Sequence, residues 1–455
     1  MTDLTMWLPQ AVAAIDRWQA EYNGPGTHAS LAVDDQALQT AFIALTERLT
    51  DNYPFFSPRY VGQMLKPPHP AAVLGYVTAM LINPNNHALD GGPATAAMEK
   101  EVVARIAAMF GLPQHLGHLT SSGTIANLEA LFIARESHPG KAIVYSADAH
   151  YTHARMCHVL GVEGISIATD ARGRMDLDAL ESALVTGRVG TVVATLGTTG
   201  LGALDPLPEI LALARAHGAR VHVDAAYGGF FSLIADDSPD GVAAAPFAAT
   251  ALADSIVVDP HKHGLQPYGC GTVLFSDPAV GRFYVHDSPY TYFTSDELHL
   301  GEISLECSRA GASAAALWLT LEVLPLTAAG LGAALRPGRR GALAWHDLHV
   351  ESDAFAPYQP PELDIVTYLP RRNSMSAVDS ASQELFTRAA QGEPAEQVHI
   401  ATYGVTERQL SERGHDLRMD APSARILRSV VMKPQSEDAI PGIHARLESI
   451  ARTIA

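Results

Sequence analysis

The residue whose surroundings most favour chemistry is Lys262, one of only five lysines in 455 residues. It follows the apolar run SIVVDP (255–260), lies between His261 and His263, and precedes Gly264. An amine at the end of a buried strand, next to imidazoles, suits the formation of a Schiff base with a carbonyl compound. A surface lysine in a turn explains the same residues about equally well.

A carboxylate with a second distinctive setting is Asp224, in the block HVDAAYGG (222–229). An acid that follows a buried strand and precedes small residues can lie against a flat ligand. There it can keep a ring nitrogen protonated, so that the ring accepts electrons. A capping aspartate is the alternative, and the flanking alanine and glycine pairs make it less favoured.

The segment TSSGT (120–124) opens a predicted helix with Ser122, Gly123 and Thr124. Free amides, hydroxyl groups and the positive end of a helix together can bind a monophosphate. Serine and threonine are also ordinary helix N-caps, so this signal is weak by itself.

His150 follows another predicted strand and could stack on a ligand ring. A metal site formed by His150, His153, Cys157 and His158 is the competing interpretation, because these residues can share a helical face. We rank zinc below ring stacking, since no fourth ligand motif accompanies the cluster.

The elements that would position these residues alternate between strands and helices. Apolar spacing predicts helices over about 98–110, 124–136 and 206–218, and strands over 142–146, 191–197, 220–226, 255–260 and 272–276. Doubly apolar strands that alternate with helices indicate an α/β fold, with a mainly parallel sheet covered on both faces. Ligands of such sheets bind beyond the carboxyl ends of the strands, where the residues above are expected.

Three regions are expected along the chain: an N-terminal helical arm (1–60), a large ligand-binding domain (61–344) and a small α+β C-terminal domain (345–455). In the last, residues 362–371 alternate like a half-exposed strand, 376–391 read as a helix, and 424–434 read as another strand.

Composition narrows the class of protein. A formal charge of −18 argues against a broad nucleic-acid or anionic-membrane surface. No apolar run approaches the roughly 20 residues that cross a bilayer, and the N-terminus makes a poor signal peptide. Three sparse cysteines, Cys157, Cys270 and Cys307, favour reduced thiols and a cytoplasmic protein.

The ordered blocks TSSGTxAN, DAH, TLGTT, HVDAAYGG and DPHK resemble the group II amino-acid decarboxylases, which depend on pyridoxal 5′-phosphate (PLP) and have fold type I. The resemblance covers roughly residues 50–435. The segment after Lys262, residues 263–269, is nearer to the archaeal tyrosine/aspartate decarboxylases and the sphingosine-phosphate lyase branch. The loop residues Ser288, Pro289 and Tyr290 also look nearer to the archaeal enzymes.

The resemblance implies a role for each matching residue. Lys262 would carry PLP as an imine, with His261 as its motif neighbour, and Asp224 would pair with the pyridinium. The other expected cofactor contacts are Ser122, Gly123 and Thr124 at the phosphate, His150 and Ala226 on opposite ring faces, and Thr199 near the ring hydroxyl or Asp224.

The resemblance also implies a homodimer with the site at the interface. A loop over 285–293 would supply Tyr290 or Tyr292 to protonate the substrate α-carbon, unless both simply pack at the interface. Arg309 would lie near the phosphate of the partner subunit. Arg428 would receive a substrate carboxylate, with a structural salt bridge as its alternative.

The expected reaction is decarboxylation of an acidic or aromatic L-amino acid to the amine and CO2, through an external aldimine and a quinonoid. Another PLP-dependent carbon–carbon lyase or an aminotransferase on the same fold is the first alternative. A non-catalytic metal-binding scaffold that uses the 20 histidines is an alternative of another class.

Overall fold

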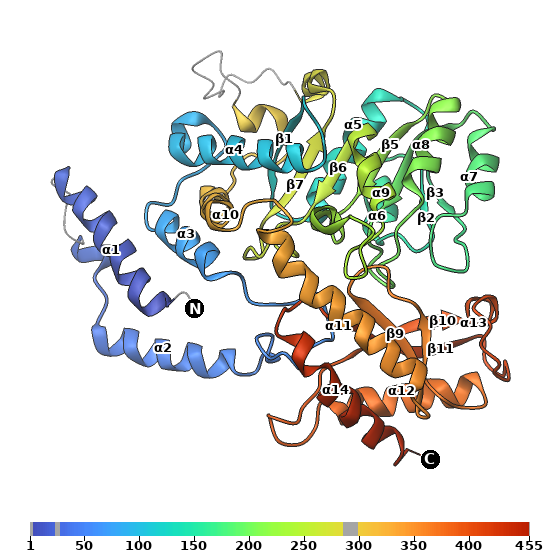
Figure 1. Cartoon of the computed structure of the whole chain (residues 1–455). Coiled ribbons are helices and arrows are strands. Elements are labelled where there is room, and N and C mark those ends of the chain that lie inside the picture. The colour runs from blue at the N-terminus through green and yellow to red at the C-terminus, as the bar shows by residue number, and fades with distance from the viewer. Residues whose placement is uncertain (1–2, 23–27, 285–298, 455) are drawn as a thin grey trace.

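A computed structural model describes residues 3–22, 28–284 and 299–454. Two lobes, each built on its own sheet, are joined to a pair of N-terminal helices (Figure 1). These are α1 (Leu4–Glu21) and α2 (Asp35–Leu49). Both begin where an aspartate, Asp3 or Asp34, accepts a hydrogen bond from a backbone amide of the first turn. Two helices therefore lie in the region expected to form a helical arm.

The large lobe has a seven-stranded sheet. Its strands, in spatial order, are β1 (Leu116–Thr120), β7 (Gly271–Phe275), β6 (Ser255–Val258), β5 (Arg220–Asp224), β4 (Val189–Thr195), β2 (Ala142–Ser146) and β3 (Gly164–Ile167). Neighbouring strands from β6 to β3 are parallel, and β7 runs antiparallel to both of its neighbours. The prediction of a mainly parallel sheet is confirmed. Sequence reasoning missed β1 and β3.

Helices cover both faces of this sheet. The helices of the large lobe are α3 (Pro70–Met80), α4 (Pro93–Met109), α5 (Gly123–Ser137), α6 (Thr152–Leu160), α7 (Leu177–Leu184), α8 (Leu207–Ala216), α9 (Ala244–Ala248) and α10 (Gly311–Val323). Successive residues of β4 enter different hydrophobic clusters. Val192 packs in the cluster that holds Ile210 of α8, while Val193 packs in the cluster that holds Leu131 of α5. All seven residues of β4 are buried, and burial on both faces explains why the strand carries no charged residue.

The C-terminal lobe has a four-stranded antiparallel sheet in the order β10-β11-β9-β8. Its elements are α11 (Leu331–Glu351), β8 (Phe355–Gln359), β9 (Ile365–Pro370), α12 (Met375–Ala389), β10 (Ala401–Thr406), α13 (Glu407–Glu412), β11 (Ser423–Val430) and α14 (Ser436–Ala451). Helix α11 runs through residue 345, so a division after residue 344 would cut a helix. The domain limits stay predictions.

The expectation that residues 362–371 form a half-exposed strand is wrong, because all six residues of β9 are buried. Val366 and Tyr368 pack against α11, α12 and α14. Ile365 joins the core of the large lobe on the other side. Alternating residues of β9 point to opposite faces of the strand, and packing between the two lobes buries both faces.

In the part of the chain that the structure describes, no helix combines the length and the apolar character needed to cross a bilayer.

Candidate active site

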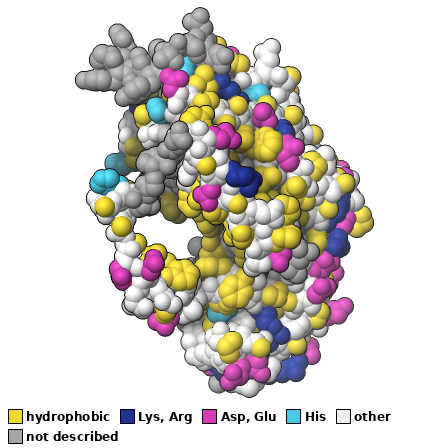
Figure 2. Space-filling view, turned by 90° about the vertical axis from the view of Figure 1, so that its left-hand side faces the viewer, with side chains coloured by type: hydrophobic (Ala, Val, Ile, Leu, Met, Phe, Trp, Pro, Cys, Tyr) yellow, Lys and Arg dark blue, Asp and Glu magenta, His cyan; other side chains and the backbone are white. Residues whose placement is uncertain are grey.

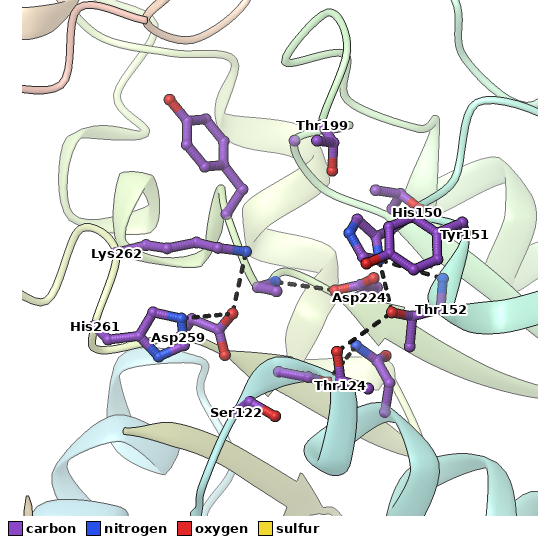
Figure 3. Close-up of a pocket in the computed structure, with 16 residues that line it drawn as sticks. Ser122, Thr124, His150, Tyr151, Thr152, Thr199, Asp224, Asp259, His261 and Lys262 are labelled. Atoms are coloured by element: carbon purple, nitrogen blue, oxygen red, sulfur yellow. Dashed lines mark hydrogen bonds and ion pairs between the residues drawn. The ribbon is translucent and has the colours of Figure 1, made fainter. Parts of the chain in front are cut away.

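A cavity of about 230 Å³ opens at the carboxyl ends of β4, β5 and β6, beside the N-terminus of α5 (Figure 3). Its lining contains nine of the expected site residues, namely Ser122, Gly123, Thr124, His150, Thr199, Asp224, Ala226, His261 and Lys262. It also contains seven residues that sequence reasoning did not single out: Asn127, Tyr151, Thr152, Thr195, Gly197, Tyr227 and Asp259. The parallel sheet thus brings together side chains that are up to 140 positions apart (122–262).

Lys262 lies in the turn after β6 and extends into the cavity (Figure 3). Its Nζ lies 3.1 Å from Oδ2 of Asp259, which follows the same strand. The other oxygen of Asp259 is buried and has no hydrogen-bond partner among the described residues. A buried acceptor without a partner in the wall of a cavity points to a polar ligand.

Gly123 is required by the close approach of this carboxylate. A Cβ atom at position 123 would lie 2.5 Å from Oδ2 of Asp259. Ser122 caps α5, with its hydroxyl accepting from the amide of Ile125 at 3.3 Å. The first amides of a helix have no intrahelical partner, so this end of α5 can bind an anion. The geometry fits a phosphate group.

Asp224 ends β5, and its Oδ2 lies 2.8 Å from Nε2 of His153. Its Oδ1 accepts a hydrogen bond from the amide of Ala226 at 3.1 Å. Burial by itself would raise the pKa of Asp224, but the hydrogen bond and charge of His153, with His222 and Lys262, hold it well below its ordinary value. An anionic carboxylate here fits a protonated pyridine nitrogen.

Sequence reasoning missed this role of His153 and treated the residue as a possible metal ligand. The described residues contain no group of three or more His, Cys, Asp or Glu side chains arranged to hold a metal ion. His150 lies just before α6 and His153 lies in its first turn, three positions apart; His150 lines the cavity and His153 contacts Asp224. That spacing was the available signal.

His150 lies across the cavity from Lys262 (Figure 3). Its Nδ1 is 2.7 Å from the hydroxyl oxygen of Thr152 and accepts from the amide of Thr152 at 3.2 Å. Burial lowers the pKa of His150 below its ordinary value, and the charge of Asp224 only partly opposes this. The ring is therefore neutral near pH 7, which suits stacking on a ligand ring.

His261 and Thr199 complete the expected lining. Nδ1 of His261 lies 2.7 Å from the carbonyl oxygen of Cys270, and burial lowers the pKa of the imidazole. The carbonyl oxygen of Thr199 accepts from Nη2 of Arg428 at 2.6 Å. The His261 side chain and the Thr199 backbone are held by contacts that reach beyond the cavity.

Arg309 and Arg428 do not line the cavity. Nη1 of Arg309 lies 2.5 Å from Oε1 of Glu99 and 2.6 Å from the carbonyl oxygen of Leu119. Arg428 is buried and also donates to the carbonyl oxygens of Gly200 and Gly62. The contacts of Arg428 within this chain are structural. The ligand roles expected for Arg309 and Arg428 stay predictions. Tyr290 and Tyr292 lie outside the described residues.

Together the cavity offers a primary amine for an aldehyde, an anionic carboxylate for a ring nitrogen, a helix N-terminus for a phosphate and a neutral imidazole for a ring face. These are the groups that PLP requires, so the residues present fit this cofactor.

Comparison with known proteins leads to the same cofactor. Residues 56–327 match the model of the pyridoxal-dependent decarboxylase conserved domain. The chain is 27% identical to an L-tyrosine decarboxylase of Enterococcus faecium over 440 residues, which covers 73% of this chain and 72% of that protein. It is 33% identical to a probable L-aspartate decarboxylase of Halobacterium salinarum over 234 residues, 51% of this chain and 63% of that protein.

The fold is similar to that of a crystal structure of Oryza sativa TDC with PLP and tryptamine. The TM-score is 0.80 at 19% identity, and the match covers 100% of this chain and 98% of the other. This likeness confirms fold type I. The chain belongs to the pyridoxal-dependent decarboxylase family and is a PLP-dependent carboxy-lyase.

Proposed function

We propose that this protein decarboxylates an acidic or aromatic L-amino acid to the amine and CO2, with Lys262 as the residue that binds PLP covalently. The observation that carries the proposal is that the Lys262 amine and the Asp224 carboxylate line one cavity with the N-terminus of α5. Bound PLP supplies an electron sink for the bond that breaks at the α-carbon.

The residues of the cavity would divide this task. Asp224 would hold a proton at the pyridine nitrogen, and His153 would keep Asp224 anionic and oriented. Asp259 would hold the Lys262 amine before the cofactor binds. The remaining roles are those expected for Ser122, Gly123 and Thr124 at the phosphate, His150 and Ala226 on the ring faces, Thr199 near the ring hydroxyl, and His261 beside the lysine.

An aromatic substrate is favoured over an acidic one by the charges of the cavity. A side-chain carboxylate is usually bound by arginine or lysine. Among the described lining residues, Lys262 is the only lysine or arginine, and the imidazoles of His150 and His261 have lowered pKa values. Tyr151 adds an aromatic ring at the cavity. The similarity to an L-tyrosine decarboxylase over most of the chain supports the same choice.

Four expected residues keep their roles as proposals. Tyr290 or Tyr292 would protonate the α-carbon, Arg309 would approach the phosphate of a partner subunit, and Arg428 would receive the substrate carboxylate. The structural salt bridge expected as the alternative for Arg428 differs from the contacts it makes, since its guanidinium donates to the carbonyl oxygens of Gly200 and Thr199 in the large lobe.

A homodimer is supported by the exposed apolar stripe on α2. Leu38, Phe42, Leu45 and Leu49 follow helical spacing, and each is 54–61% exposed. Figure 2, which views the molecule from the side of α1 and α2, shows hydrophobic side chains gathered on this face around a hollow. An apolar helical stripe of this length needs a partner surface. A second copy of the chain is the partner we propose. The expected cytoplasmic location stays a prediction.

The test compares Lys262→Ala with Lys100→Ala, a control on the polar side of α4. Each variant is loaded with PLP, and CO2, amine, keto acid and aldehyde are measured with tyrosine, tryptophan, aspartate and glutamate. Lys262→Ala should lose both CO2 release and the visible absorption of the imine, while Lys100→Ala should retain them. Normal decarboxylation by Lys262→Ala would refute the proposal, and keto acid or aldehyde without CO2 would favour another PLP reaction.

A further inference from the structure

A buried carboxylate of the C-terminal lobe contacts two segments of the active site. Asp364 directly precedes β9 and is 1% exposed. Its Oδ1 accepts a hydrogen bond from the hydroxyl of Tyr227 at 2.5 Å, and its Oδ2 lies 2.9 Å from Nε2 of His263. Tyr227 lines the cavity, and His263 is the residue after Lys262. One side chain thus joins three segments that are distant in sequence.

The hydrogen bonds of His263 engage both of its ring nitrogens. Nδ1 lies 3.0 Å from the carbonyl oxygen of Tyr227, which can only accept, so Nδ1 carries a proton. Burial by itself would raise the pKa of Asp364, but His263 and the hydroxyl of Tyr227 hold it below its ordinary value. Nε2 faces this carboxylate, so both ring nitrogens of His263 are held by groups on other segments of the chain.

These contacts hold the turn that carries Lys262. The ring of His263 packs edge-on against Tyr227 and Phe231, with centroids 4.7 and 4.8 Å apart. On the other side of the turn, the Lys262 amine contacts Asp259. The turn has little freedom between these contacts, because a Cβ at Gly264 would lie 2.6 Å from Cα of Pro260. The orientation of the turn that carries Lys262 therefore depends on the contact between His263 and Asp364.

We propose that Asp364 is a positioning residue for the reaction, which holds Lys262 through His263 and the loop after Asp224 through Tyr227. The C-terminal lobe would then set the relative position of the amine and the ring-pairing carboxylate. This inference rests on the role proposed above for Lys262, and it adds a residue 101 positions from His263 to the machinery.

The test uses Asp364→Asn, His263→Phe and the double variant. Asp379→Asn is the matched control, because Asp379 is also paired in the C-terminal lobe, with Arg425, but lies far from the cavity lining. Apoprotein of each variant is mixed with PLP, and the rate of imine formation is measured from the rise in visible absorbance, normalised to the concentration of folded protein. Visible circular dichroism of the bound cofactor, kcat and KM are measured on the same samples.

Asp364→Asn and His263→Phe should each slow imine formation and lower kcat by about ten- to hundredfold, since small misplacements of reacting groups have effects of this size. Both should alter the visible circular dichroism. The double variant should be no slower than the slower single variant, because both changes remove the same contact. The double variant also serves if a single variant does not fold, since it removes both members of the buried pair together.

The proposal is overturned if Asp364→Asn lowers only the thermal midpoint, while its folded molecules form the imine at the normal rate with an unchanged spectrum. It is also overturned if Asp379→Asn slows imine formation equally. A wrong assignment of Lys262 would give a different result. In that case Lys262→Ala, which leaves Asp364 intact, would retain the visible absorption of the imine.

Discussion

Replacement of His153 provides the sharpest test of how this site controls its cofactor. His153 is fully buried, and its Nε2 donates to Asp224 across 2.8 Å. Leucine at position 153 would remove the donor and leave Asp224 buried with one hydrogen bond, from the amide of Ala226. Glutamine could place an amide N–H near the former Nε2 position. The pair His153→Leu and His153→Gln therefore separates the hydrogen bond from the packing.

The size of the effect follows from the charge on the acceptor. A hydrogen bond to a charged group contributes about 1.5–3 kcal/mol. Because about 1.4 kcal/mol is tenfold in rate or affinity, its loss would lower kcat or PLP affinity by about ten- to hundredfold. The pKa of Asp224 would rise toward its ordinary value, since His153 is the main group that lowers it against the effect of burial.

The assay measures PLP affinity by titration of the apoprotein and kcat by CO2 release, with thermal unfolding of each apoprotein as the folding control. His153→Leu should show the full loss, and His153→Gln should recover most of it. The reasoning fails if His153→Leu behaves like the wild type, or if His153→Gln is as impaired as His153→Leu although both fold.

Three further predictions concern backbone space, pH and assembly. Gly123→Ala should lower PLP affinity at least about tenfold, because a Cβ there collides with the carboxylate beside the pocket lysine; Gly404→Ala, with open space around it, should leave titrations unchanged. His349 is buried without a hydrogen-bond partner among the described residues, and burial holds its pKa well below 6.5. The neutral, buried His349 therefore contributes stability above pH 6.5, and this contribution is lost as the pH falls below that value. In urea titrations at several pH values, the unfolding free energy of the wild type should fall with pH by up to about 1.4 kcal/mol per pH unit more than that of His349→Phe. Phe42→Asp on the apolar stripe of α2 should convert a dimer to a monomer in light scattering, whereas an unchanged dimer would contradict the proposed interface.

Much of the site could be predicted because its residues follow strands. Lys262 and Asp224 each end an apolar run, and Ser122 to Thr124 open a helix. Parallel strands place their carboxyl ends on one edge, so a local pattern was enough to predict that these side chains meet. The antiparallel β7 and the edge strand β3 show the limit of the pattern. Apolar periodicity indicates neither the direction of a strand nor its position at the edge of a sheet.

The partners of the site residues could not be predicted. His153 reaches Asp224 over 71 positions, and Asp364 reaches His263 over 101. Arg309 offers the reverse case, since it pairs with Glu99, 210 positions away, instead of lining the cavity of its own chain. The sequence around a charged side chain does not indicate which oppositely charged residue it will contact in the folded protein.

The sequence by itself predicted the mainly parallel sheet and the strand ends at which the site residues lie, because alternating apolar strands and helices admit few arrangements. Its motifs, through their resemblance to a known family, predicted the fold type and the cofactor. Only the tertiary structure decided the ionisation of Asp224, the buried contact of His263 with Asp364, and the complete burial of β9. These depend on which surfaces exclude water together, and that is a property of packing between distant segments, which no local pattern of residues contains.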